Sequence, residues 1–300
     1  MKEVTLDANA RVAPRAAHAL ADYVALTKPR LNLLVVATSA AGYYLGSPGA
    51  PGAWRMAEAV AGTALVAGGA AVLNQVYERD TDALMRRTRT RPLPDGRVGA
   101  ADARLFGGAL SLAGLALLAL RANALAAALA LATLVIYLAV YTPMKRRTSL
   151  STLVGAVPGA LPPLIGWAAA RGSVDVGGAT LFAVVFLWQI PHFMAIAWMY
   201  REDYATAGFP MLPVVEPDGR RAGRQAVLYS AALVPTSLAA ALVGVSGTIY
   251  FVVATLLGVG LVVLAWRFAS SRTDRSARAL FLGSIIYLPL LWLTMIANHS

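Results

Sequence analysis

The feature that most constrains this chain is a succession of apolar runs, each about as long as a bilayer is thick. A helix that crosses the hydrocarbon core needs about 20 mostly apolar residues. About nine such runs are present: residues 31–46, 56–76, 103–120, 123–142, 150–170, 178–199, 226–245, 249–267 and 279–297. A membrane β-barrel would instead show short segments of alternating polarity. The sequence therefore predicts an all-α, polytopic membrane protein, a bundle of about nine transmembrane helices.

The basic residues predict the orientation of that bundle. With nine spans, all lysines and arginines except Arg55, Arg121 and Arg171 fall in one set of loops. Because basic loops remain in the cytoplasm, we expect a cytoplasmic N-terminus, an external C-terminus and an odd number of spans. We divide the chain into a cytoplasmic N-terminal segment, 1–30, and a single transmembrane domain, 31–300.

The net charge of +11 could indicate a nucleic-acid partner. The basic cytoplasmic loops and their attraction to anionic lipid explain it more simply, so we expect a bilayer partner and no nucleic acid. The first 28 residues lack the apolar core of a secretory signal. They are rich in Ala and Arg, which leaves a mitochondrial transit peptide as the alternative to our prediction of a multi-pass protein of the cell inner membrane. The absence of cysteine excludes disulfides.

A stripe of polar residues marks the end of the second run. Asn74, Glu78 and Asp82 are spaced four residues apart, which places them on one face of a helix, whereas Asp80 points roughly the other way. Carboxylates at the end of a membrane helix are costly unless they bind something. Oxygen ligands without His or Cys suit Mg²⁺ or Mn²⁺. The alternative is a solvated helix end with chance charges.

Basic residues follow the stripe and recur at the end of the fourth run. The first group is Arg86, Arg87, Arg89 and Arg91, and the second is Lys145, Arg146 and Arg147. Acids for a metal beside arginines for phosphate oxygens predict a clamp for a metal-bound polyphosphate. The alternative for each group is that it only holds its loop in the cytoplasm.

A third segment, from Trp188 to Pro213, carries both aromatic and acidic residues. His192 lies inside a predicted span, beside Trp188, and could face a flat aromatic substrate or serve only in packing. The same helix leads to Glu202 and Asp203. The loops after the second and sixth runs also resemble each other, with a Tyr and acids followed by Pro-Asp-Gly, which would place two acidic helix ends opposite each other. Chance similarity between two cytoplasmic loops is the alternative.

These motifs together carry a family resemblance. Asn-x₃-Glu-x₃-Asp followed by "MRRTRTRPL" resembles the UbiA-type intramembrane prenyltransferases, and within them the branch that farnesylates haem. The segments "LTKPRLNLLVVATSAAGYYL", "YTPMKRRT", "GAVPGALPPLIGW", "WQIPHF" and "DYATAGFPMLP" also look like that branch, in the same order.

The resemblance implies a nine-helix bundle around a cavity that opens toward the cytoplasm and the lipid. It implies transfer of the farnesyl group of farnesyl diphosphate to the 2-vinyl group of haem B, with addition of water, giving haem O and diphosphate. Mg²⁺ would be the cofactor and haem B a substrate. A haem A synthase or a terminal oxidase assembly would be a further partner.

The resemblance also assigns roles to residues. The expected catalytic residues are Asn74, Glu78, Asp82 and Lys145. The expected diphosphate-binding residues are Arg86, Arg87, Arg91, Lys145, Arg146, Tyr200 and Asp203. The expected metal ligands are Asn74, Glu78 and Asp82, with Glu202 and Asp203 as further candidates. The expected haem contacts are His192 and Trp188.

Two departures from the family pattern concern the metal. Glu78 stands where the family usually has Asp, and Tyr200 and Tyr204 occupy the outer positions of the second Asp-x₃-Asp motif. The second departure argues against a second Mg²⁺ held entirely by protein.

Two rival functions remain. A sibling prenyltransferase would act on a quinone or chlorophyll precursor. An ion-coupled transporter would place its acids near the middle of the bilayer, whereas most acids here lie at predicted cytoplasmic helix ends.

Overall fold

The computed structural model describes residues 12–299, so part of the predicted N-terminal segment lies outside the described residues. Over that range the chain is helical. The helices are α1 (Val12–Leu26), α2 (Pro29–Gly46), α3 (Ala53–Asp82), α4 (Ala100–Arg121), α5 (Ala124–Val135), the π-helix η1 (Ile136–Tyr141), α6 (Thr142–Met144), α7 (Ser151–Arg171), α8 (Val176–Met199), α9 (Arg201–Thr206), α10 (Leu212–Val215), α11 (Arg220–Leu242), α12 (Thr248–Ser271) and α13 (Asp274–Ala297). The predicted domain boundary at residue 30 falls just inside α2.

Eight helices in the described part of the chain are long and apolar enough to cross a bilayer, which confirms a multi-pass, all-α membrane protein. They are α3, α4, the continuous α5–η1–α6, α7, α8, α11, α12 and α13. The predicted first span forms α2, which is not among the eight because Arg30, Asn32 and Ser39 dilute its apolar content. It nevertheless packs in the bundle beside α3 and α7.

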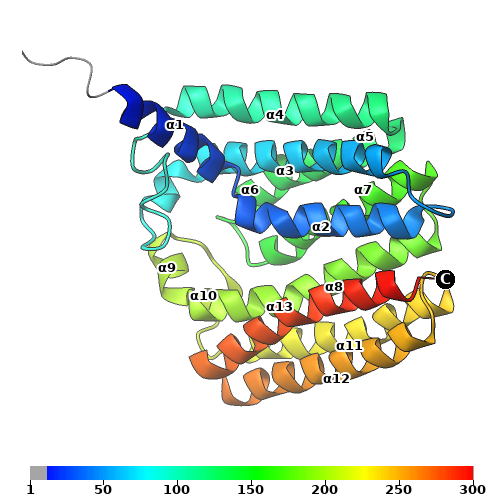
Figure 1. The fold of residues 1–300 in the computed structure, drawn as a ribbon. Helices are drawn as coiled ribbons and strands as arrows, with labels where there is room; N and C mark the ends of the chain where they lie inside the picture. Colours follow the sequence, from blue (N-terminus) through cyan, green and yellow to red (C-terminus); the bar gives the residue numbers. More distant parts are fainter. Residues whose placement is uncertain (1–11, 300) are drawn as a thin grey trace, which may run out of the picture.

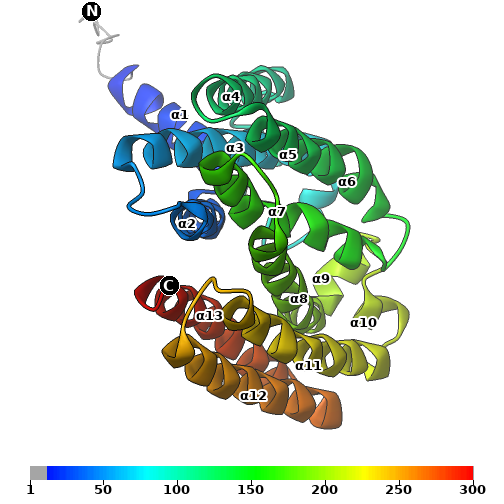
Figure 2. The same ribbon diagram turned by 90° about the vertical axis from the view of Figure 1, so that its right-hand side faces the viewer.

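The long helices form two groups, which Figures 1 and 2 show from the side and from the end. The first contains α2, α3, α4, α5 and α7, and the second contains α8, α11, α12 and α13. Helices α7 and α8 join the groups along their length, and α2 also touches α13. The first group has a core around Val66 and Leu118. A larger core around Trp188, Tyr250 and Phe268 fills the second group and extends to α2 and α7 of the first.

Close backbone contact fixes α2 against α7. A Cβ atom added at Gly42 would lie 2.0 Å from the carbonyl oxygen of Pro163, and one added at Gly166 would lie 2.0 Å from that of Ser39. Only glycine allows two helices to approach so closely. This contact sets the position of α2, whose first residues lie near the candidate site.

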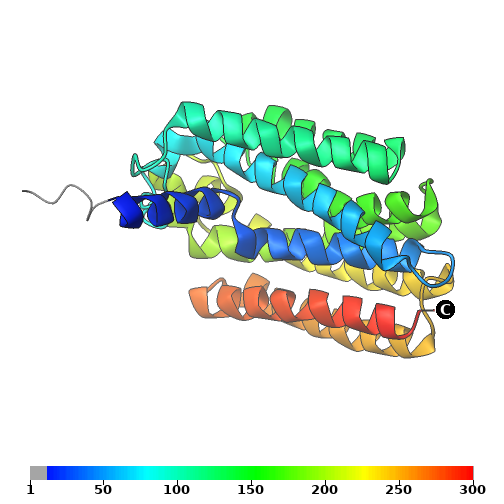
Figure 3. The same cartoon turned by 45° about the horizontal axis from the view of Figure 1, so that its top comes forward.

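The two ends of the bundle carry different connections. One end holds α1, the segment 83–99, the turn between α6 and α7, and the short helices α9 and α10 (Figures 1 and 3). The other end holds the α2–α3, α7–α8 and α11–α12 turns, together with the end of α13. At that second end Asn123 and Asp175 cap α5 and α8 by accepting backbone N–H groups.

Candidate active site

The predicted polar stripe lies on one buried face at the end of α3. Asn74, Glu78 and Asp82 are 2%, 5% and 1% exposed. The side chain of Asp80 is 87% exposed and pairs with Arg79. The one-face arrangement predicted from the spacing is therefore present in the structure.

Each carboxylate of the stripe has a basic partner from elsewhere in the chain. The Lys145 ammonium donates to both oxygens of Glu78, at 2.9 and 3.1 Å. Arg91 donates to Asp82 Oδ2 at 2.6 Å. The acids and two of the predicted phosphate-binding cations thus lie in direct contact.

Asn74 is held by a different helix. Its Nδ2 donates to Thr142 Oγ1 at 3.1 Å. With the amide nitrogen engaged, the amide oxygen is the atom that Asn74 can offer to a cation. Thr142 follows the π-helix η1 directly.

Lys28 belongs to the same cluster, although the sequence suggested only a role in topology. It precedes α2 in a left-handed conformation with φ of 50° and interacts electrostatically with Glu78, Asp82, Arg91 and Lys145. Burial lowers the pKa of the Lys28 ammonium to about 8, with Arg91 adding to the shift. In the sequence, Lys28 is marked only by the Pro that follows it at the start of a helix. The packing of α2 against α7 brings Lys28 to the stripe.

Arg87 connects the two loops whose sequences resemble each other. Its guanidinium lies 5.0 Å from the ring centre of Tyr200 and 4.8 Å from that of Tyr204, a cation–π arrangement. The loops after α3 and α8 therefore meet, as the internal resemblance suggested. Arg86 and Arg146 are exposed at this end of the bundle, and neither pairs with a carboxylate among the residues described.

The segment after α8 packs beside the stripe. Phe209, 1% exposed, lies in a small core with Met85 and Tyr204, and the Lys145 ammonium is 5.0 Å from the Phe209 ring centre. Glu202 is exposed and Asp203 is half-buried. This segment thus brings a buried aromatic ring to Lys145 of the site.

The donor atoms of the stripe fit a hard divalent cation. Within residues 12–299 no three His, Cys, Asp or Glu side chains gather closely enough to hold a metal ion. The available set is two carboxylates and one amide oxygen, to which a diphosphate would add its own oxygens. Mg²⁺ commonly binds through one or two carboxylates and substrate phosphates, so the residues present fit it.

The two predicted haem contacts lie between α8 and α13. Trp188 is 4% exposed and donates its indole N–H to the Ser284 carbonyl. The His192 ring is half-buried and stacks on the rings of Trp188 and Phe281, whose centres are each 5.0 Å from its own. The Nδ1 atom of His192 is 2.8 Å from Ser284 Oγ. Because that hydroxyl gives its proton to the Phe281 carbonyl, Nδ1–H is the donor and the His192 Nε2 keeps a lone pair.

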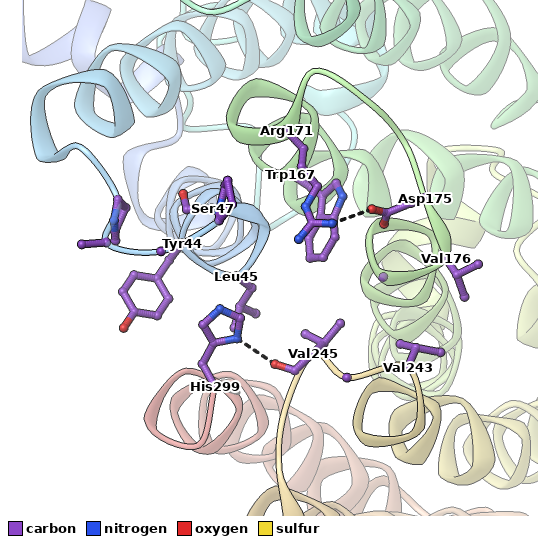
Figure 4. A pocket seen from close by; sticks show the side chains of 16 residues that line it. Tyr44, Leu45, Ser47, Trp167, Arg171, Asp175, Val176, Val243, Val245 and His299 are labelled. Atoms are coloured by element: carbon purple, nitrogen blue, oxygen red, sulfur yellow. Dashed lines mark hydrogen bonds and ion pairs between the residues drawn. The ribbon is translucent and has the colours of Figure 1, made fainter.

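A cavity of about 700 Å³ lies at the opposite end of the bundle (Figure 4). Tyr44, Trp167, Arg171 and His299 line it. It is separate from the acidic stripe, since these residues come from the far ends of α2, α7 and α13.

Comparison with known proteins identifies the relatives of this chain. Residues 35–292 match the UbiA prenyltransferase family. The protoheme IX farnesyltransferase of Solibacter usitatus is 49% identical over 93% of this chain and 98% of its own. The protein of the same name from Koribacter versatilis is 42% identical over 96% of each chain.

Solved structures share the fold. A digeranylgeranylglyceryl phosphate synthase covers 94% of this chain and 98% of its own, with a TM-score of 0.79 and 16% identity. A UbiA homologue from Archaeoglobus fulgidus bound to GPP and Mg²⁺ covers 92% of this chain and 99% of its own, with a TM-score of 0.67 and 19% identity.

Proposed function

This chain belongs to the UbiA prenyltransferase family, and from that premise we propose that it transfers the farnesyl group of farnesyl diphosphate to the 2-vinyl group of haem B. Water adds in the same reaction, and the products are haem O and diphosphate. The observation that carries the proposal is the buried stripe of Asn74, Glu78 and Asp82 with its basic partners. The names of the relatives support haem as the acceptor, in preference to a quinone or chlorophyll precursor.

The donor is held by its charged end. Asn74, Glu78 and Asp82 would hold Mg²⁺, which supplies positive charge against the charge that develops on the departing diphosphate. Lys145 and Arg91 donate to phosphate oxygens, and Lys28 and Arg87 add positive charge. These groups lie at the end of a membrane helix, so the farnesyl tail can extend between apolar helices while its head remains bound.

The acceptor step needs room for a flat ring and the exclusion of water. In our proposal His192 contacts haem through Nε2, because Nδ1 is held by Ser284, and Trp188 supports the His192 ring from behind. The vinyl group is electron-rich and attacks the allylic carbon without a general base. Exclusion of water until that attack favours transfer over hydrolysis.

The remaining roles follow from position and charge. Arg86, Arg146, Tyr200 and Asp203 would form the outer shell of the diphosphate site, and Glu202 would not be required for the metal. The site would face the cytoplasm, since the basic loops are at its end. A haem A synthase or terminal oxidase assembly would receive the product.

The test is the haem extracted from cells that express the full chain. A haem species heavier than haem B by one farnesyl group and one hydroxyl group is expected, and Glu78→Gln should not produce it. A purified protein that farnesylates a quinone precursor and leaves haem B unchanged would instead establish the sibling function.

A further inference from the structure

Three groups near the stripe form a directed chain of hydrogen bonds. The Thr142 hydroxyl lies 2.7 Å from the carbonyl oxygen of Tyr137 and 3.1 Å from Asn74 Nδ2. A carbonyl oxygen can only accept, so the single hydroxyl proton goes to Tyr137. The hydroxyl oxygen must then accept from Asn74. Thr142 and Asn74 are 1% and 2% exposed, so water does not compete readily for these bonds.

This chain sets the orientation of the Asn74 amide. An asparagine amide has similar shape in its two flipped orientations, and only its hydrogen-bond partners distinguish them. If it flipped, its oxygen would meet the lone pairs of Thr142, and its NH₂ would face the cation that the stripe is proposed to bind. The Thr142 hydroxyl therefore favours the orientation in which the amide oxygen is free to be a ligand.

The π-helix places Thr142 for this role. The Tyr137 carbonyl accepts both the backbone N–H and the side-chain hydroxyl of Thr142, the five-residue spacing of a π turn. A π turn holds one extra residue, which rotates the following helix by about 100° relative to an uninterrupted α-helix. Thr142 and Lys145 both follow η1 and both contact α3 residues of the stripe.

Helix α7 leaves space for the π turn. Tyr141 is the last residue of η1. A Cβ atom added at Gly155 of α7 would lie 2.6 Å from its Cε2 atom. The Tyr141 ring also stacks on that of Tyr137, with centres 5.4 Å apart. The widened turn is thus supported by the neighbouring helix.

We propose that Thr142 is a positioning residue: it fixes the amide of Asn74 so that Oδ1 faces the Mg²⁺–diphosphate site, and the π-helix η1 serves to place it there. The inference rests on the proposed function, because it assumes that Asn74 is a ligand of the metal. Thr142 itself touches neither the metal nor the substrate.

The test compares Thr142→Val, which keeps the shape of the side chain, with Thr142→Ser, which keeps the hydroxyl. Binding of an unreactive thiolo analogue of farnesyl diphosphate to the purified full chain is measured by calorimetry over a series of Mg²⁺ concentrations. Thr142→Val should raise the Mg²⁺ concentration needed for half-maximal binding by up to about tenfold, the usual scale for one hydrogen bond. Thr142→Ser should restore it. Thr133→Val is the matched control, since among residues 12–299 the Thr133 hydroxyl bonds only the Leu129 carbonyl of its own helix.

A double-mutant cycle with Asn74→Ala separates positioning from packing. If Thr142 acts through Asn74, the double variant should bind no more weakly than Asn74→Ala alone. Independent, additive losses would overturn the proposal, as would an unchanged Mg²⁺ requirement in Thr142→Val. A wild-type protein that binds the analogue equally well without any divalent cation would instead contradict the metal clamp of the proposed function.

Discussion

At the scale of single residues, the acids of the stripe carry opposite charge to their neighbours and the same charge as the expected substrate. Glu78 and Asp82 are buried, and each accepts a charged hydrogen bond from a cation. A metal between these oxygens and a diphosphate removes the repulsion between the two anions. The reactivity of the site should therefore depend on the carboxylate charges more than on their volume.

Glu78→Gln or Asp82→Asn should lower farnesyl transfer by roughly 100-fold or more, about 2.7 kcal/mol in the barrier. Asp80→Asn is the matched control, because Asp80 is exposed and paired with Arg79, and it should change the rate little. Transfer is measured in detergent with saturating Mg²⁺, and thermal unfolding is recorded for each variant. Equal losses in all three would contradict the one-face arrangement.

His192 should separate the use of haem from the use of the donor. His192→Ala should weaken haem binding, followed by the shift of the haem absorbance band, while hydrolysis of farnesyl diphosphate without acceptor persists. The physical reason is that the His192 Nε2 has a lone pair available, and its ring contacts Trp188 on α8 and Phe281 on α13, whereas the stripe is on α3. A folded His192→Ala variant with an unchanged haem spectrum would make His192 a packing residue.

Lys28 should make diphosphate binding dependent on pH. Its pKa is lowered to about 8, so the ammonium is charged below that pH and loses its proton as the pH rises through it. The affinity for inorganic diphosphate at saturating Mg²⁺ should therefore be highest below pH 8 and fall severalfold above it. Lys28→Gln should bind more weakly below pH 8 and lose this dependence; an identical pH profile in the variant would assign the titration to another group.

The sequence predicted the stripe more fully than its surroundings. The spacing of Asn74, Glu78 and Asp82 is a local property of one helix, so it could be read directly. Lys28, Thr142 and Phe209 come from other parts of the chain, and only tertiary packing brings them to the stripe.

At the scale of the elements, close backbone contacts at Gly42 and Gly166 hold α2 against α7. Gly166→Ala should lower the unfolding temperature by several degrees, because the added methyl group would lie 2.0 Å from the Ser39 carbonyl and overpacking commonly costs about 1–3 kcal/mol. Gly108→Ala is the control, since no neighbouring atom of the described part of the chain lies within 4 Å of its added Cβ, and it should be neutral or slightly stabilising. Both are compared by thermal unfolding in detergent; equal stability would mean that α2 can shift without cost.

The positions of the long helices could be predicted because hydrophobic length is encoded locally. The run 123–142 corresponds to α5, η1 and the start of α6, but nothing in its composition indicates a π turn. The ring of Tyr141, at the end of that turn, lies against Gly155 of α7, a residue outside the run. Helix α2 was also predicted as a span from its local apolar stretch. Its polar residues lower its mean hydropathy, so it is less apolar than the other eight long helices.

At the scale of the whole molecule, the predicted orientation can be tested directly because the chain has no native cysteine. Ala50→Cys and Thr90→Cys place single thiols at exposed positions on opposite ends of the bundle. In intact cells a membrane-impermeant thiol reagent should label Ala50→Cys at once and Thr90→Cys only after lysis. Each variant should retain transfer activity, and the reverse labelling pattern would invert the proposed topology.

The ion pairs Glu78–Lys145 and Asp82–Arg91 affect how Mg²⁺ and diphosphate bind to the site. A divalent cation that binds these carboxylates competes with two side-chain cations, and a diphosphate is the natural acceptor for the cations that it displaces. Binding is then an ionic exchange, in which neither ligand alone gains much and each raises the affinity for the other by the same factor. The protein would thereby bind the Mg²⁺–diphosphate complex more tightly than it binds free Mg²⁺ or free diphosphate.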